Sequence, residues 1–476
     1  MPKTHAELMQ EGVSVLTTCQ TDLEESASYY EATNRVETIG ISTPEQMKHL
    51  RASIGWGRMY CDSIEERLDH EGFRLADNQE SVSELLQWWQ SNDLDEESGL
   101  AHLDALVYGR SYVTVSAPGP DDEDQDTPII RVESPLNMYV TTDPRTRKVT
   151  SAVRLYTNPV NRAEKWGTLY LPNETVYLKQ VNGQWAVDSE NPTVTHNLGQ
   201  VPVVPLLNRE RLGDREGQSE ITAEIRSFTD AASRTMMNMQ AASELMAVPQ
   251  RVLFGVGPEQ LAPGGTKAEV LKAYMANILA VADTDGSAQQ FSAAELRNFV
   301  DVLEELAKHV ASYTGLPPQY LSFTTENPAS AEAIRSAESR LVKKCERKAR
   351  MFGGAWEEVM RLAVRIMKGS VPVEMRRLQS IWRDPSTPTY AAKADGVSKL
   401  YANGMGVIPK RRARVDIGYT EEEIDQMEEW DEDDKAELIK LADVLQAQQP
   451  NPTNDPSKGS VPSGNRPDST KKAPAA

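Results

Sequence analysis

Cysteine is scarce in this 476-residue chain, and long apolar runs are missing. The three cysteines, Cys19, Cys61 and Cys345, lie far apart, are odd in number and match no metal-ligand spacing. This usage is typical of a reduced, cytosolic protein with cysteines in its core, and it argues against a disulfide framework. No stretch approaches the roughly 20 apolar residues that span a bilayer, and the N-terminus lacks the basic-then-apolar order of a signal peptide. We therefore expect no membrane association.

Recognisable catalytic motifs are also missing. The segment APGGTK (262–267) has glycines and a lysine, but not the lysine directly after the second glycine that a phosphate-binding P-loop needs. The six histidines stand alone, and no G-x-S-x-G elbow or cysteine-nucleophile signature is present. We therefore expect no catalytic residue, no metal site and no cofactor. Abundant carboxylates leave a metal-dependent nuclease open as an alternative.

Negative charge is in excess and unevenly placed. The formal net charge of -20 argues against a protein that grips nucleic acid over its whole surface. Between Glu421 and Asp443 there are twelve Asp or Glu residues and two Lys, which is half of the excess. Such a run is usually a solvated helix face, and the alternative is a repulsive lining where a polyanion passes. The neighbouring basic run PKRRAR (409–414) favours charge pairing within or between chains over nucleic-acid binding.

Residues 292–368 predict a helix, a proline-containing break and a much longer helix. Apolar residues recur at helical spacing from Leu296 to Val310, and Gly315 ends this first helix. Asn327–Pro328 starts the second helix, and Gly369 stops it. At about 1.5 Å per residue the second helix is roughly 60 Å long, more than a compact domain needs. The two helices therefore form a rigid frame that presents the segment between them.

The rest of the chain predicts an α+β fold. A capping box of Thr4 and Glu7 starts a first helix, which runs to about residue 33, and a second helix from Thr43 has apolar positions as far as Leu68. Asn182–Gly183 is a strong hairpin signal. The remaining predictions, in chain order, are a strand in 71–77, helices in 81–93 and 95–108, strands between 109 and 187, a long helix from about 218, a protruding Gly/Pro-rich α+β insertion, three short helices in 390–447 and a disordered tail from 450.

A basic run, KKCERKAR (343–350), lies on the polar faces of the long second helix. The simpler interpretation is a solvated helix face paired with Glu338 and Glu346. Alternatively, the run contacts DNA phosphate or an acidic neighbour.

Six stretches in this order resemble the portal proteins of tailed bacteriophages, in particular those of siphophages of actinobacteria. They are LLQWWQSNDLDEES, DALVYGRSYVTV, SPLNMYVTTDPRT, GQSEITAEIRSFTDAASRTMMNM, YTGLPPQYLSF and SAEAIRSAESRLVKKCERKARMFGGAWEEVMRLA. Together they cover most of residues 81–368 in the order of the family, and this collinearity makes the match specific.

The resemblance implies a portal-type architecture with long stem and wing helices, a β-rich wing, a small α+β clip and a helical crown. Twelve copies would form a ring at one capsid vertex, around a channel for DNA packaging and ejection. The implied parts are wing 1–216, stem helix 217–248, clip 249–291, second stem helix 292–316, tunnel loop 317–327, long wing helix and return strand 328–388, crown 389–448 and disordered tail 449–476.

The resemblance also implies functional residues and partners. In the tunnel loop, which would approach DNA, they are Ser322, Phe323, Thr324, Thr325, Glu326 and Asn327. In the clip, where the terminase large subunit and later the head-to-tail adaptor would dock, they are Pro258, Glu259, Gln260, Gly264, Gly265 and Lys267. On the stem, where copies would pack in the ring, they are Ile225, Phe228, Ala232 and Met239.

The other implied partners are the major capsid protein, the scaffold and double-stranded DNA sliding through the channel. The implied location is the virion, with the host cytoplasm during assembly. An acidic protein suits such a channel, because neutralised phosphates would give tight binding and stall the DNA. Two alternatives remain at this point: a metal-dependent nuclease of phage DNA processing and a structural scaffold that forms no ring.

Overall fold

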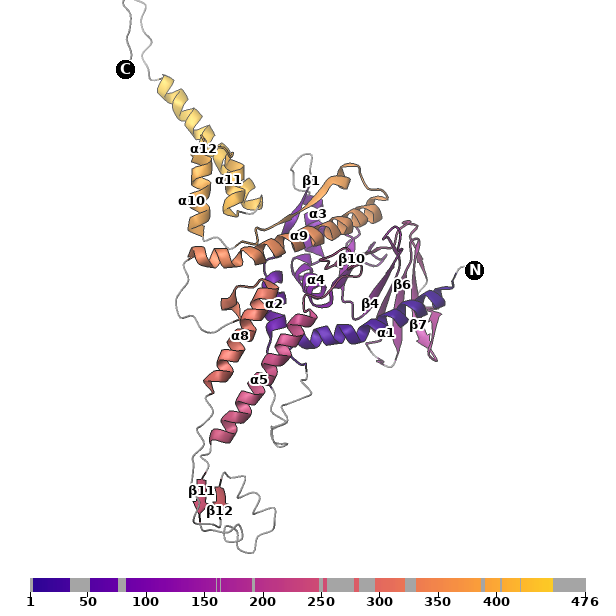
Figure 1. The fold of residues 1–476 in the computed structure, drawn as a ribbon. Coiled ribbons are helices and arrows are strands. Elements are labelled where there is room, and N and C mark those ends of the chain that lie inside the picture. The colour runs from indigo at the N-terminus through magenta and orange to yellow at the C-terminus, as the bar shows by residue number, and fades with distance from the viewer. Residues whose placement is uncertain are drawn as a thin grey trace, which may run out of the picture. The chain divides into compact units, whose positions relative to one another are not determined.

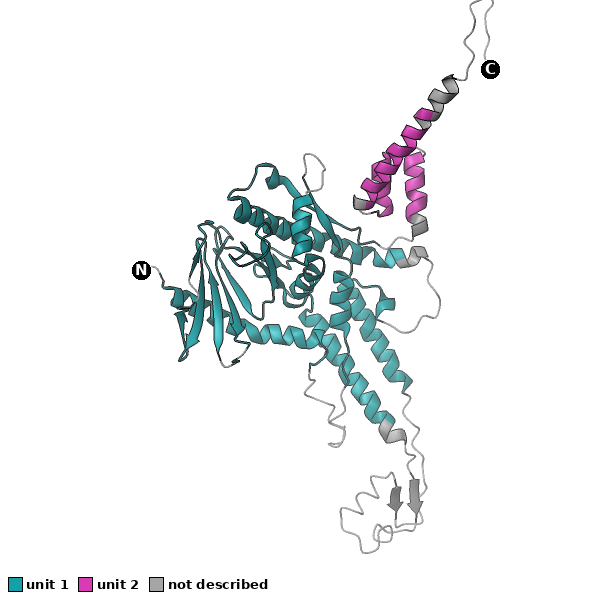
Figure 2. Ribbon diagram, turned by 180° about the vertical axis from the view of Figure 1, so that it is seen from behind, with its two compact units in different colours: residues 1–387 teal, residues 388–476 magenta. Residues whose placement is uncertain are grey.

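The computed structural model describes residues 3–34, 52–75, 83–159, 161–162, 164–190, 193–247, 251–254, 278–281, 296–321, 331–386, 390–402, 405–419 and 421–447. The chain divides into two compact units, residues 1–387 and 388–476, which Figure 2 shows in teal and magenta. Unit 1 mixes helices and sheets, and the described part of unit 2 is helical. The α+β class is therefore as predicted.

Unit 1 begins with a long helix that packs on an antiparallel sheet. Helix α1 (His5–Tyr30) starts with the predicted capping box, in which Thr4 and Glu7 satisfy each other's free backbone amides. It covers a sheet with the strand order β4-β5-β6-β7-β8, in which β9 also pairs with β7. The strands are β4 (Met138–Thr142), β5 (Val149–Thr157), β6 (Lys165–Tyr170), β7 (Glu174–Val181), β8 (Gln184–Val187) and β9 (Val194–Thr195). Met9 of α1 and Trp185 of β8 are buried in the small core between helix and sheet.

The central core of unit 1 is built around the long helix α9 (Ala331–Lys368), and its elements come from distant parts of the sequence (Figure 1). Phe352 and Trp356 of α9 are completely buried there. Around α9 lie two small antiparallel sheets, with the orders β10-β2-β3 and β1-β13. The other elements of this region are α2 (Trp56–Glu65), β1 (His70–Leu75), α3 (Ser83–Ser91), α4 (Leu94–Tyr108), β2 (Arg110–Ser116), β3 (Ile129–Glu133), β10 (Val203–Leu207), η3 (Glu374–Arg377) and β13 (Leu378–Trp382).

Two further helices of unit 1 run side by side as a pair of rods, α5 (Ala223–Ala247) and α8 (Arg297–Thr314) (Figure 1). Between them in the sequence, β11 (Arg251–Phe254) and β12 (Ile278–Val281) pair in parallel. A 3-10 turn, η2 (Pro318–Tyr320), follows α8. Helix, break and long helix thus follow one another as the periodicity predicted.

Unit 2 contains α10 (Tyr390–Tyr401), α11 (Lys410–Ile417) and α12 (Glu421–Ala447). The predicted break near Gly418 is confirmed, because this glycine ends α11 in a left-handed conformation. The third helix is not short, however: α12 has 27 residues.

One predicted helix start is wrong, and another lies outside the described residues. The predicted start of the second helix at Thr43 is not among the residues that the structure describes. Within them, residues 52–55 are not helical and α2 runs only from Trp56 to Glu65, so the predicted continuation through Ile54 to Leu68 is wrong. Helix α5 begins at Ala223 rather than near residue 218, because the amide of Glu220 donates to the carbonyl of Leu106 and keeps this part of the chain out of the helix. Residues 450–476, the predicted disordered tail, lie outside the described residues. None of the described helices is long and apolar enough to cross a membrane.

Candidate functional site

The candidate site is the frame formed by α5, α8, η2 and the first half of α9. Phe228 of α5 stacks on His309 of α8, with 5.5 Å between ring centroids and an interplanar angle of 7°. Its ring centroid is 5.6 Å from that of Tyr313, one helical turn further along α8. Small buried side chains, including Ala232 and Ala311, let the two backbones approach closely.

The four predicted stem residues differ in how much surface they leave free. Ile225 and Ala232 are 3% and 0% exposed within the single chain. Both side chains are therefore already packed within their own chain. Phe228 and Met239 are half-buried and keep surface for a contact with another molecule.

The C-terminal end of α8 is fixed to α9 at a glycine. Gly315 has a φ of +78° and ends α8, as predicted. The side chain of Arg340, from α9, lies against it, and a Cβ atom at Gly315 would be 2.9 Å from Arg340 Cδ. Arg340 Nη1 also donates to the carbonyl of Ser312 at 2.8 Å. A larger residue at this position would have to displace that arginine.

A buried cluster of polar side chains then links η2, α9 and the end of α2. Tyr320 donates to Glu338 Oε1 at 2.7 Å and accepts from Arg67 Nη2 at 2.9 Å. The Arg67 and Glu338 side chains form an ion pair at 3.6 Å and are both nearly buried. Burial and the bond to Glu338 raise the pKa of Tyr320, so its hydroxyl keeps its proton and remains a donor. Because removing one partner would leave a buried charge, these contacts fix η2 to α9 and to the end of α2.

A second buried cluster anchors the root of α5 to α9. Glu220, just before α5, accepts from Lys344 Nζ at 2.7 Å and from Lys348 Nζ. Lys348, which is 0% exposed, also donates to Asn208 Oδ1. Burial alone would raise the pKa of Glu220, but Lys348 and Lys344 lower it to about 2. The carboxylate is therefore charged at neutral pH.

This cluster corrects the prediction for the basic run of residues 343–350. The pair of Lys343 and Glu346, at 2.7 Å, and the exposed Arg347 and Arg350 match the predicted solvated face. Glu338 pairs with Arg67 instead, and Lys344 and Lys348 point into the protein. Neither interpretation foresaw two lysines meeting one buried glutamate. The available signal was weak: Lys344 and Lys348 are one turn apart and flank Cys345, a core position.

The predicted pairing of PKRRAR with the acidic segment is confirmed within unit 2. Arg411 contacts Glu428 at 2.8 Å and Asp425 at 3.3 Å. Arg414 contacts Asp431 at 2.7 Å, and Lys410 contacts the same carboxylate. These cations therefore pair with acidic residues of α12 in the same chain.

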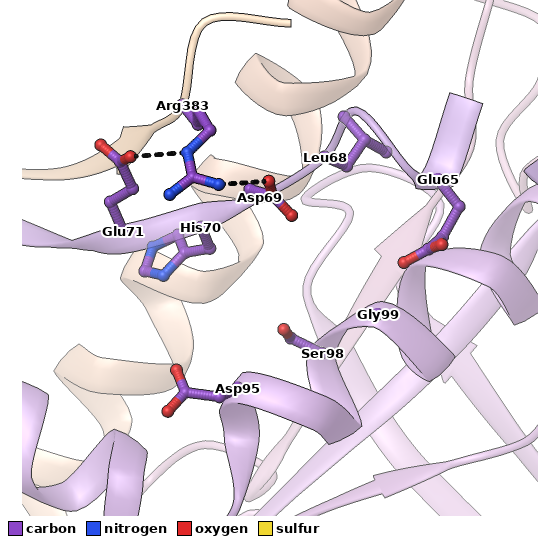
Figure 3. Close-up of a pocket in the computed structure, with 9 residues that line it drawn as sticks. All are labelled: Glu65, Leu68, Asp69, His70, Glu71, Asp95, Ser98, Gly99 and Arg383. Atoms are coloured by element: carbon purple, nitrogen blue, oxygen red, sulfur yellow. Dashed lines mark hydrogen bonds and ion pairs between the residues drawn. The ribbon is translucent and has the colours of Figure 1, made fainter. Parts of the chain in front are cut away.

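A separate pocket of about 260 Å³ lies between β1, α4 and Arg383 (Figure 3). Arg383 binds the carboxylates of Asp69 and Glu71, each at 3.2 Å. His70, at its edge, stacks on Trp89, and burial lowers its pKa to about 3, so the imidazole is neutral. Within the described ranges, no three His, Cys, Asp or Glu side chains are grouped to hold a metal ion. The visible contacts of this pocket are structural.

The predicted tunnel-loop residues 322–327 and the predicted clip residues Pro258, Glu259, Gln260, Gly264, Gly265 and Lys267 lie outside the described residues. The structure therefore describes the elements that flank these two segments, η2 and α9 in one case and α5 and α8 in the other.

Comparison with known proteins gives a consistent result over nearly the whole chain. The sequence model of the family described as "Phage portal protein, SPP1 Gp6-like" matches residues 19–439. The portal protein of Mycobacterium phage L5 is 51% identical over 462 residues, which cover 96% of this chain and 94% of that protein. The portal protein of Mycobacterium phage D29 is 52% identical over 440 residues, which cover 91% and 90%.

Among solved structures, a chain of the "Neck of native GTA particle computed with C12 symmetry" is similar, with a TM-score of 0.39 and 14% sequence identity. The match covers 79% of this chain and 94% of that chain.

Proposed function

This chain belongs to the SPP1 Gp6-like family of phage portal proteins, and from that premise we propose that its copies form a ring at one capsid vertex, around the channel through which DNA is packaged and ejected. The observation that carries the proposal is the family match over residues 19–439. The pair of rods supports it, because α8 keeps Val300, Val302 and Tyr313 substantially exposed, as a helix does that has a further partner. We expect twelve copies in the ring.

We assign the parts of the portal as follows. Helices α5 and α8 form the stem, and the insertion 249–291 between them forms the clip. Residues 317–327 form the tunnel loop, and residues 389–448 the crown. The remainder of residues 1–388 forms the wing. Three observations support this assignment: α5 and α8 are neighbours, β11 pairs with β12 inside the insertion, and the boundary between the compact units falls at residue 387.

The charge distribution suits a channel that releases DNA. Tight, salt-dependent binding needs several cations that can neutralise phosphates. Here the net charge is -20, and the basic run of α9 directs Lys344 and Lys348 to Glu220. Arg411 and Arg414 are bound to the acids of α12. Several cations of the described basic clusters are therefore paired with carboxylates of the same chain.

The partners we propose are the terminase large subunit and later the head-to-tail adaptor at the clip, with the major capsid protein and scaffold around the ring. The protein would reside in the virion at the capsid vertex after assembly in the host cytoplasm. We assign it no catalytic residue and no cofactor, because ATP hydrolysis in this scheme belongs to the terminase.

Deletion of residues 249–291, replaced by a short Gly/Ser linker, is expected to leave ring formation intact and to abolish binding of terminase and adaptor. The physical reason is that α5 and α8 are neighbours at their roots independently of the insertion, through Phe228, His309 and Tyr313. Negative-stain imaging measures the rings, and co-purification measures both partners. Retained binding of either partner to rings of the deletion variant contradicts the clip assignment.

A further inference from the structure

Helix α8 carries a partly exposed stripe with the spacing of a helix-packing seam. Val302, Leu306, His309 and Tyr313 follow one another at intervals of four, three and four residues. This pattern brings side chains to one face, as in helices that pack against a partner. Val302 and Tyr313 are 48% and 58% exposed, whereas Leu306 is half-buried. The stripe lies at the flank of the α5–α8 pair, because Phe228 of α5 contacts both His309 and Tyr313.

Helix α5 carries a face that is complementary to the α8 stripe, on the side opposite to its own buried residues. At 100° per residue, Ala223, Ser227 and Arg234 point away from the side on which Ile225 and Ala232 are buried. All three are exposed. The first two are small and leave room for a large side chain. Arg234 has no ionic partner within the described part of the chain, whereas the α8 stripe is flanked by the acidic Glu305.

The two faces also lie at matching heights on the rods. Helices α5 and α8 are antiparallel neighbours, and Phe228 fixes their register beside His309 and Tyr313. Along the axis of α5, Arg234 then lies about 9 Å beyond Phe228, at about 1.5 Å per residue. Glu305 is about 6 Å from the level of His309 and about 12 Å from that of Tyr313 on the same scale. Arg234 and Glu305 therefore stand at nearly the same level.

We propose that the stem of the ring closes by packing the α8 stripe of one copy on the outward face of α5 in the next copy, with Glu305 bound to Arg234 across the interface. The occupant is a second copy because both halves of the match are on this chain, and copies in a closed ring stand at the same height. Tyr313 packs over Ala223 and Ser227, and Glu305 leaves its exposed contacts with Lys308 and His309, which are weak. This inference rests on the proposed ring.

The inference changes which stem residues make the contact between copies. Ile225 and Ala232, predicted for this role, are already buried in their own chain. Phe228 remains, as the residue that supports the His309 and Tyr313 side chains from behind. Val302, His309 and Tyr313 of α8 take the place of the two buried residues.

Charge reversal tests the ion pair in the full-length chain. Arg234→Glu and Glu305→Arg, each alone, are expected to lower the fraction of protein in rings by about tenfold or more, because like charges then face each other at every interface. The double variant is expected to recover the ring fraction to within about twofold. Arg297→Glu is the matched control, since it reverses an exposed charge on α8 outside the stripe. Mass photometry measures the ring fraction.

A cysteine pair provides an independent readout. Tyr313→Cys combined with Ser227→Cys is expected to give a ladder of covalent multimers on non-reducing gels after mild oxidation, which the wild type and either single variant do not give. The inference is overturned if the wild type forms rings normally but the charge-reversed double variant recovers no rings and the cysteine pair gives no ladder. The proposed ring itself would stand in that case. Absence of rings from the wild type overturns the proposed function itself.

Discussion

Glu220→Gln is expected to lower the free energy of unfolding of unit 1 by about 3–5 kcal/mol, the usual cost of leaving a buried charge without its partner. Glu220 is 4% exposed and faces two ammonium groups, those of Lys344 and Lys348. Removing its charge leaves Lys348, which is completely buried, with Glu210 as the nearest carboxylate, at 3.8 Å and half exposed. The cluster joins the residues just before α5, the helix that we propose for the stem, to α9, so this variant should also lose rings.

Glu346→Gln is the matched control for Glu220→Gln, because it removes a carboxylate that pairs with the exposed Lys343 on the same helix. It should change stability by no more than about 0.5 kcal/mol. Denaturant unfolding monitored by tryptophan fluorescence measures both variants. Equal stability of the two would show that the buried cluster contributes little.

The same cluster predicts the direction in which the free energy of unfolding changes with pH. The pKa of Glu220, at about 2, lies below the value of about 4.3 for an unfolded glutamate. Its contribution to stability is therefore complete above the unfolded pKa and is lost as the pH falls toward 2. The wild type should lose more stability than Glu220→Gln over this interval.

Gly217→Ala is expected to destabilise unit 1 by about 3 kcal/mol or more, because two separate costs coincide. Gly217 has a φ of +85°, which an alanine adopts only with strain. Its Cβ would also lie 1.8 Å from the carbonyl oxygen of Gly109. That carbonyl accepts from the amide of Asn208 at 2.8 Å, so it cannot move without breaking the contacts at the root of α5.

Gly183→Ala separates the two costs of Gly217→Ala. Gly183 has a φ of +81° in the β7–β8 hairpin, and its Cβ would meet nothing within 4 Å. Gly183→Ala should be destabilised only by the backbone strain, which costs about 1–2 kcal/mol. Thermal unfolding and soluble yield compare the two variants. Similar losses in both would mean that the close approach of Gly217 and Gly109 has no energetic role.

Elements specified by neighbouring residues could be predicted from the sequence. The Thr4 and Glu7 capping box starts α1, and Asn182–Gly183 forms the β7–β8 turn, with both residues at positive φ. Gly315 ends α8 as expected. In each case the signal and the structure lie within a few residues of each other, so no knowledge of the fold was needed.

The buried polar clusters could not be predicted, because their members are far apart in the sequence. Lys348 and Glu220 are separated by 128 residues, and Tyr320 meets an arginine 253 residues away. In sequence, Lys348 is indistinguishable from Lys343, which is exposed, because both occupy polar positions of one amphipathic helix. Only the packing of α2 and the α5 root on α9 decides which lysine is buried.

The site was predicted only in outline. The resemblance supplied the family, which the comparisons confirm, and the rods that frame the site are present. The stem residues were chosen from an apolar stripe, and a stripe shows which face is buried without showing against which molecule. Two of the four, Ile225 and Ala232, are buried within their own chain, whereas Phe228 and Met239 keep surface for a contact with another molecule.

The measurement that tests the central claim most directly is the mass and shape of the protein purified after co-expression with the capsid and scaffolding proteins of its phage. Native mass spectrometry and negative-stain imaging should give rings with a central hole, at about twelve times the 52.8 kDa chain mass if the family's symmetry holds. A stable dimer that cleaves DNA in a divalent-metal-dependent way would contradict the account.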